Sequence, residues 1–210
     1  MKNYDIGFVV VGSLMTVVFL IIVNLITGPG YPWVIYPAFA LILWIMGYYF
    51  IRKGKHRQLA LFYSLLIILF LILTNHLNTP DYPWFLFAVY PLLWWPILVF
   101  LGDKAAAMST ALIGSISIII YYFILNMIFS PQYLWVIYPA FVVLWWPLSL
   151  YHVKRGTYFQ YSIHASLLIT LFFICVNVIS SPGTIWAVYP IFCVLWWPLS
   201  MYYFVYKLEK

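Results

Sequence analysis

Eight apolar segments of about 20 residues follow one another along the chain, with only a few residues between each segment and the next. A helix of about 20 apolar residues crosses the hydrocarbon core of a bilayer, which is about 30 Å thick. Hydrophobic residues make up 67% of the chain and charged residues 7%, a composition that excludes a soluble domain. The sequence therefore predicts an all-α integral membrane protein, with transmembrane helices over residues 7–27, 32–51, 58–78, 83–101, 107–129, 133–151, 158–179 and 184–205.

The basic residues predict the orientation of these helices. All ten Lys and Arg residues lie before the first segment, after the last, or in every second loop, whereas the other loops hold one charged residue, Asp81. Short loops rich in Lys and Arg stay in the cytoplasm, so we expect a multi-pass protein of the cell membrane with both termini cytoplasmic. The formal charge of +6 then reports topology. No soluble element offers a basic face for nucleic acid.

A period of 51 residues runs through the whole chain without insertion or deletion. It gives four tandem copies, residues 7–57, 58–108, 109–159 and 160–210, and each copy contains two of the predicted helices. We expect four helical hairpins with the same orientation, pseudo-symmetric about an axis normal to the membrane. Five columns are identical in all copies: Ser13, Ser64, Ser115 and Ser166; Asn24, Asn75, Asn126 and Asn177; Pro29, Pro80, Pro131 and Pro182; Trp33, Trp84, Trp135 and Trp186; Trp44, Trp95, Trp146 and Trp197.

The Ser and Asn columns are the candidate polar sites. Ser13 and Asn24 are 11 residues apart, about three helical turns, and so lie on one face of the first helix of the hairpin. Polar side chains within lipid turn toward other helices, so we expect both columns to face inward. Two interpretations are open for them: hydrogen bonds that pack the helices, or a polar ring around the axis.

The second Trp column lies deep in the bilayer and is the candidate aromatic lining of such a cavity. An indole N–H in hydrocarbon needs an acceptor. A proline inside a helix leaves the carbonyl four residues earlier without its helical donor. Such prolines follow three of the four deep tryptophans, at Pro96, Pro147 and Pro198. The Ser column is expected at the same depth as these tryptophans, and we call its members the deep serines. The carbonyls that the prolines free, or the hydroxyls of the deep serines, are the expected acceptors for the indoles.

A hydroxyl residue followed by proline is typical of a helix start. We therefore expect the second helix of the hairpin to begin at Thr79, Ser130 and Ser181 in the last three copies. A second proline, eight residues after this first proline, would then lie inside the helix and bend it. This second proline occurs at Pro37, Pro139 and Pro190.

The sequence offers no set of catalytic residues. It contains no metal-ligand cluster, phosphate-binding loop or pair of intramembrane acids, so we expect no enzyme activity, no metal and no cofactor. His164 is the histidine that lies within a predicted helix, and we expect it to form a hydrogen bond to another helix.

The last copy resembles the bacterial two-transmembrane (2TM) domain family. The family pattern is an aromatic-rich helix with an early His, an Asn near its end, a short Pro/Gly turn, W-x-x-x-P and a later Trp. The matching residues in this sequence are His164, Asn177, Trp186, Pro190 and Trp197. The other copies match through the internal period but lack the early His. The resemblance implies a membrane module found attached to varied proteins, and no activity of its own.

These features lead to two hypotheses about function. The first is a non-catalytic membrane scaffold, sensor or binding module. Its expected partners are membrane lipids, a second copy of the chain, a partner membrane protein or a small hydrophobic ligand. The alternative is a channel or transporter for an uncharged, aromatic or quaternary-ammonium molecule, which passes through the pseudo-symmetric bundle.

Overall fold

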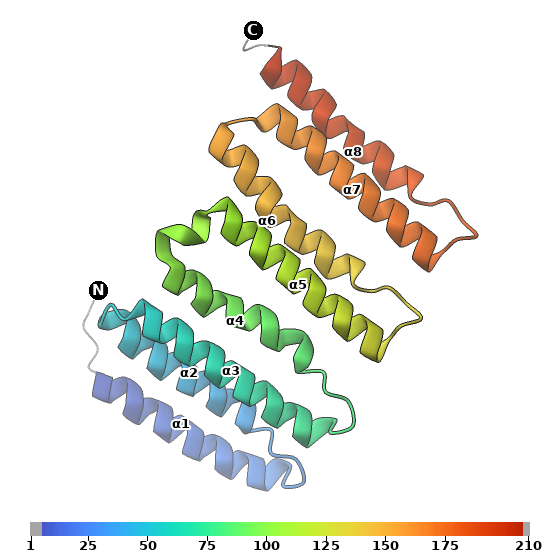
Figure 1. Ribbon diagram of the computed structural model, residues 1–210. Coiled ribbons are helices and arrows are strands. Elements are labelled where there is room, and N and C mark those ends of the chain that lie inside the picture. The colour runs from blue at the N-terminus through green and yellow to red at the C-terminus, as the bar shows by residue number, and fades with distance from the viewer. Residues whose placement is uncertain (1–5, 208–210) are drawn as a thin grey trace. The chain divides into compact units, whose positions relative to one another are not determined.

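The computed structural model describes residues 6–207, and these form eight α-helices with no strand among them (Figure 1). This confirms the predicted all-α class. The chain divides into two compact units at Phe100, which are described separately. The first contains α1 (Ile6–Thr27), α2 (Ile35–Arg52), α3 (His56–Asn78) and α4 (Leu86–Leu101). The second contains a short 3-10 helix (Gly102–Ala106), α5 (Met108–Phe129), α6 (Ile137–Arg155), α7 (Tyr158–Ser180), α8 (Val188–Met201) and a terminal π-turn (Tyr202–Tyr206).

Seven of the eight described helices are long and apolar enough to cross a membrane. The exception is α6, whose sequence holds two prolines, two tryptophans and the charged pair Lys154 and Arg155. Each observed helix lies within a few residues of the segment predicted for it. A multi-pass membrane protein is therefore the class that both the sequence and the helices support.

Within each unit, a helix packs mainly against the helices that precede and follow it in the chain. In the first unit α2 contacts both α1 and α3, and in the second unit α6 contacts α5 and α7, while α7 also contacts α8. The ribbon shows the helices of each unit side by side and antiparallel, with α5 and α8 at opposite sides of the second unit (Figure 1). Within the second unit the helices thus form a row, in which α5 and α8 each pack on one α-helix of that unit.

The outer loops, which join the two helices of each hairpin, all contain seven residues: 28–34, 79–85, 130–136 and 181–187. The prediction that Thr79, Ser130 and Ser181 start helices is wrong. Each of them ends the preceding helix and donates its backbone N–H to the carbonyl of Asn75, Asn126 or Asn177. The next helix starts seven residues later, so Pro37, Pro139 and Pro190 lie in its first turn. A first-turn proline removes no helical hydrogen bond, and the bend expected there has no cause.

The inner turns between α2 and α3 and between α6 and α7 are tight because each contains a glycine with positive φ. Gly54 and Gly156 both have a φ of 64°. Backbone N–H groups after each helix bond back to its last turn, from Lys55 to the Phe50 carbonyl and from Thr157 to the His152 carbonyl. This is the usual glycine-terminated helix end, which a residue with a side chain at that position would strain. It brings the second helix of one hairpin against the first helix of the next.

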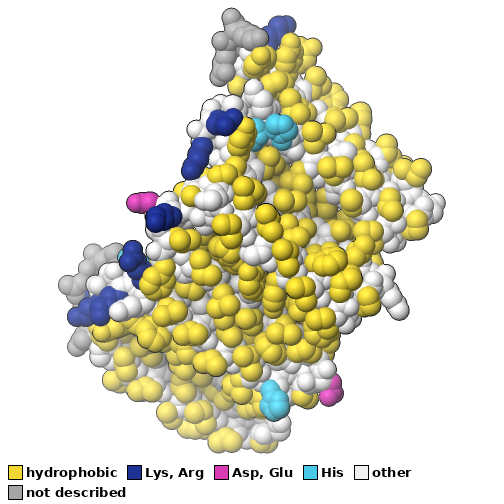
Figure 2. All heavy atoms as spheres, viewed as in Figure 1, with side chains coloured by type: hydrophobic (Ala, Val, Ile, Leu, Met, Phe, Trp, Pro, Cys, Tyr) yellow, Lys and Arg dark blue, Asp and Glu magenta, His cyan; other side chains and the backbone are white. Residues whose placement is uncertain are grey.

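The buried residues are few and mostly small, whereas large apolar side chains cover the surface. Ala60, Ala111 and Ala165 are almost fully buried and let neighbouring helices approach closely. In the view of Figure 2, hydrophobic side chains cover the middle of each unit, and Lys and Arg lie at helix ends. An apolar surface of this extent is stable when lipid or other apolar helices cover it.

Candidate functional site

Each Asn of the repeat binds the outer loop of its own hairpin. Asn126 is fully buried. Its Nδ2 donates to the carbonyls of Ser130 at 2.7 Å and Tyr133 at 2.9 Å, and its Oδ1 accepts the backbone N–H of Val136 at 2.9 Å. Both amide protons and the amide oxygen are therefore in use. The side chain connects the end of α5, the loop and the start of α6.

The same three hydrogen bonds recur around the other asparagines. The loop residues that bond to Asn24 are Gly28, Tyr31 and Val34; those for Asn75 are Thr79, Tyr82 and Phe85; those for Asn177 are Ser181, Thr184 and Ala187. All the distances lie between 2.6 and 3.2 Å. The four asparagines are all buried. Their amides hold backbone groups, and a ring of four around an axis stays a prediction.

The deep serines bond to the carbonyls that the helix prolines free. Ser64 Oγ donates to the Leu92 carbonyl at 3.0 Å, and Ser115 Oγ donates to the Val143 carbonyl at 3.1 Å. Ser166 makes the equivalent, longer contact to Val194 at 3.5 Å. These carbonyls lie four residues before Pro96, Pro147 and Pro198. The sequence predicted the freed carbonyls, and in the structure serine hydroxyls are the donors that reach them.

The first hairpin lacks this contact because it lacks the proline. Ile45 stands where the other copies have Pro96, Pro147 and Pro198. Its N–H is able to bond to the Leu41 carbonyl within α2. Ser13 is buried but forms no side-chain hydrogen bond to another described residue. The hairpin thus provides a natural comparison for the serine contact.

The deep tryptophans lie toward the surface of the units. Trp44 is 64% exposed, Trp95 and Trp197 are exposed to a smaller extent, and Trp146 is half-buried. Trp44 and Ser13 line a shallow groove between α1 and α2, together with Phe8, Gly12 and Tyr48. An exposed indole in a membrane helix contacts lipid or a partner helix, so this column forms an outward aromatic surface within the described units.

The two hairpins of each unit meet through aromatic rings, and the outer part of this contact is the same in both units. The rings of Phe39 and Phe70 stack with centroids 3.9 Å apart between α2 and α3. Their counterparts 102 residues later, Phe141 and Phe172, stack at 4.1 Å between α6 and α7. Tyr36 and Tyr138 add edge contacts, each at 5.8 Å from the same Phe70 or Phe172 ring.

A histidine pair closes the inner end of the α6–α7 contact. His152 Nε2 and His164 Nδ1 are 2.9 Å apart, and His152 Nδ1 is 2.7 Å from the Thr157 hydroxyl. This confirms the expected hydrogen bond from His164 to another helix. Its partner was not predicted from the sequence because His152 follows the predicted span 133–151 beside the basic Lys154 and Arg155.

His152 is enclosed where α6 packs on α7. Its side chain is 2% exposed. Each of its ring nitrogens has a partner, the Thr157 hydroxyl at Nδ1 and the His164 ring at Nε2. When both rings are neutral, one ring nitrogen of the pair donates to the other.

Comparison of the chain with models of protein families, with curated proteins and with solved structures finds no match. Function is therefore inferred from the contacts of the chain itself. Among residues 6–207, no three His, Cys, Asp or Glu side chains are grouped closely enough to hold a metal ion. Cys175 and Cys193 are both free and exposed.

Proposed function

We propose that the protein is a non-catalytic multi-pass scaffold of the cell membrane, which binds lipids and partner helices through its exposed aromatic surfaces. One observation carries the proposal. The intramembrane Asn side chains and three of the four deep Ser side chains are bonded to backbone groups of their own hairpin. A pathway for a polar or charged molecule needs polar groups that face the pathway. Apolar faces suited to lipid and helix contact remain.

The topology belongs to the same proposal. We propose that α6 crosses the membrane as the eighth span, because its neighbours α5 and α7 meet the length and hydropathy expected of spans and it connects an outer loop to an inner turn. The four hairpins are then copies of one module of the 2TM type, related by pseudo-symmetry, with both termini in the cytoplasm.

Flux measurements on the purified protein in liposomes test this proposal against the channel alternative. Tetramethylammonium, a quaternary ammonium probe, and glycerol, an uncharged one, are loaded inside the liposomes, and their release is followed with time. A scaffold leaves release at the rate of protein-free liposomes. Release that exceeds the rate of protein-free liposomes, and that increases with the amount of folded protein, would contradict the scaffold function and support transport.

Fluorescence quenching tests the lipid contact. Phospholipids brominated in their acyl chains quench tryptophans that touch them, so the unmodified protein should lose a large share of its emission. Trp44→Phe removes the most exposed deep indole and should lower the quenched share. Trp146→Phe, which removes a half-buried indole at the equivalent position, is the matched control and should change it less.

A further inference from the structure

The contact between hairpins has two complementary halves. One half is the second helix of a hairpin, which presents Phe39 and Phe50 in α2 and Phe141 and His152 in α6. The other half is the first helix of the next hairpin, which presents Phe62 and Phe70 in α3 and their counterparts His164 and Phe172 in α7. Although the inner pair is Phe50–Phe62 in one unit and His152–His164 in the other, the two helices meet through the same positions.

The helix α1 has the same place in its hairpin as α3 and α7. Within the described part of its unit, no preceding helix packs on the positions that α3 and α7 use for this contact. The 51-residue period aligns Phe19 with Phe70 and Val11 with Phe62. Phe19 is 63% exposed, and both residues lie in an apolar groove of about 470 Å³ lined only by α1, through Val11, Leu14, Met15, Val18, Phe19 and Ile22. Because α2 packs against the side of α1 that holds the buried Ser13 and Asn24, this groove lies on another side of the helix.

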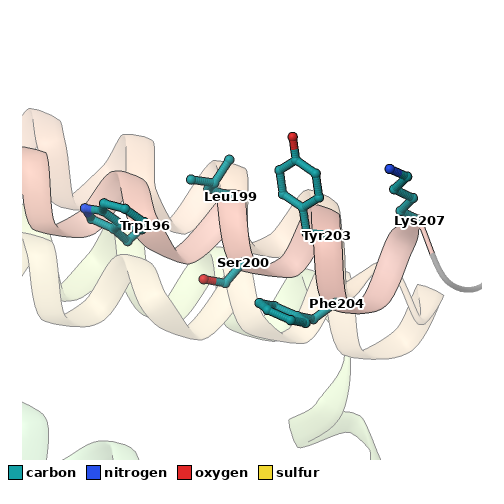
Figure 3. A pocket seen from close by; sticks show the side chains of 6 residues that line it. All are labelled: Trp196, Leu199, Ser200, Tyr203, Phe204 and Lys207. Atoms are coloured by element: carbon teal, nitrogen blue, oxygen red, sulfur yellow. The ribbon is translucent and has the colours of Figure 1, made fainter.

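The helix α8 has the same place in its hairpin as α2 and α6, and so carries the half of the contact that these two helices present. The period aligns Phe192 with Phe141, and Tyr203 in the terminal π-turn with His152. Phe192 is 61% exposed, and Tyr203 is 52% exposed where Phe50 and His152 are 9% and 2% exposed. Tyr203 and Ser200 belong to a surface groove of about 710 Å³ with Trp196, Leu199, Phe204 and Lys207. Figure 3 shows that these side chains all project from the one helix, with no second helix between them.

We propose that copies of this chain associate head to tail in the membrane, with α8 of one copy packed on α1 of the next as α2 packs on α3. Phe192 then stacks on Phe19 of the neighbouring copy, and Tyr203 covers its Val11. The inference rests on the proposed scaffold function and names the partner as a second copy of the chain. Because the two halves differ, the interface is heterologous, and such an interface closes into a ring or extends as a chain of copies.

The chemistry of the two grooves favours this partner over an unrelated one. The groove on α1 is lined by apolar side chains alone, and the groove on α8 adds one charge, Lys207, at the end of the helix. Val11 and Phe19 on α1 occupy the positions at which Phe62 and Phe70 meet α2, and Phe192 and Tyr203 on α8 occupy the positions at which Phe141 and His152 meet α7. A second copy therefore supplies the complementary side chains at the spacing that the internal contact uses, with the same membrane orientation.

Cysteine cross-linking between two tagged chains tests the proposal. Both chains carry Cys175→Ser and Cys193→Ser; one adds Phe19→Cys with one tag, and the other adds Phe192→Cys with a different tag. They are produced together, and the membranes are treated with a short bis-maleimide. We expect a cross-linked dimer that holds both tags, whereas each chain alone gives none.

Matched controls make every outcome decisive. Phe141→Cys with Phe172→Cys in one chain must form an internal link, since their rings stack at 4.1 Å, and this fixes the reach of the reagent. Absence of the two-tag dimer while this control links overturns the proposal. So does a dimer of the Phe19→Cys chain alone, which indicates a symmetric contact. A double Phe19→Cys, Phe192→Cys chain that links only within itself also overturns it and shows closure of α8 on α1 in one molecule.

A second measurement guards against variants that fold poorly. Phe19→Ala should lower the mass of the protein in detergent, measured by light scattering, from the oligomer toward the monomer. Phe123→Ala removes an exposed ring of α5 that lies on neither groove and should leave the mass unchanged. Equal loss in both variants contradicts the interface. The liposome flux assay is independent: flux together with the two-tag dimer would reject the scaffold function and leave the interface in place.

Discussion

At the scale of single residues, the polar side chains within the apolar helices bond mainly to backbone groups of their own hairpin. Each Asn replaces the hydrogen bonds that a loop at the membrane surface would otherwise need from water, with two donors and one acceptor. Each deep Ser bonded in this way supplies a donor for a carbonyl that proline has freed. The conserved spacing within the repeat thus reflects backbone needs at two depths of the hairpin.

The Asn contact predicts a large loss of stability on substitution. Asn126→Leu removes three hydrogen bonds and leaves two loop carbonyls without their donor, so we expect a loss of about 2–4 kcal/mol. Reversible unfolding in mixed micelles measures the difference. The control is Ile128→Ala, which shortens an exposed side chain two residues away and should cost little. Equal destabilisation by the two variants would remove the assigned role of Asn126.

The Ser contact predicts coupling between a serine and a proline far apart in the sequence. Pro147→Ala restores an N–H for the Val143 carbonyl, so Ser115→Ala should cost about 0.5–1.5 kcal/mol with Pro147 present and almost nothing without it. A double-mutant cycle in micelles measures this coupling. The first hairpin is the natural control: Ser13→Ala should be nearly neutral because Ile45 frees no carbonyl. Additive effects at Ser115 and Pro147 would contradict the contact.

The sequence alone predicted part of this residue-scale picture. The 51-residue period located the Asn and Ser columns, and the chemistry of proline predicted the freed carbonyls at Leu92, Val143 and Val194. From the sequence we expect indole donors for these carbonyls, whereas the structure has the serine hydroxyls as donors. The donor and the loop that binds Asn126 depend on the distance between two helices and on the path of a seven-residue loop. Neither quantity is fixed by spacing within one helix.

At the scale of helices, a buried histidine pair joins α6 to α7. His152 is 2% exposed, and its Nε2 lies 2.9 Å from His164 Nδ1. The first unit has two stacked phenylalanines, Phe50 and Phe62, at the same positions. We therefore expect ring packing to contribute most of the stability at these positions.

A paired substitution tests the role of ring packing. His152→Phe with His164→Phe copies the Phe50–Phe62 stack of the first unit, whose centroids are 5.5 Å apart. The double variant should keep the α6–α7 packing and most of the stability measured by unfolding in micelles. His152→Ala alone should cost about 1–3 kcal/mol, since it empties a buried position and removes a partner of His164. Equal losses of stability in the double variant and in His152→Ala would contradict ring packing as the basis of this contact.

Helix boundaries were predicted closely at the odd-numbered helices and less well at the even-numbered ones. Hydropathy marked the ends of α1, α3, α5 and α7 to within two residues. The starts of α2, α4, α6 and α8 were placed three to four residues too early, because apolar Tyr and Trp continue through the loops and hide their irregular backbone. The Asn amide, which fixes that backbone, acts from a different helix.

At the scale of the whole molecule, the proposed orientation predicts the accessibility of the two kinds of turn. Gly30→Cys lies in an outer loop and Lys53→Cys in an inner turn, both in a chain with Cys175→Ser and Cys193→Ser. A thiol reagent that does not cross membranes should label Gly30→Cys on intact cells and Lys53→Cys only after permeabilisation. The opposite pattern would invert the topology, and labelling of both on intact cells would place them on the same side.

The asparagine contact also bears on how the chain enters the membrane. The two helices of a hairpin and the loop between them contain every group that bonds to the Asn side chain. A newly made hairpin can therefore satisfy its amide as soon as its second helix leaves the ribosome, before any later segment is synthesised. Assembly can proceed two helices at a time, and no stage of biogenesis needs to leave an asparagine amide facing the acyl chains.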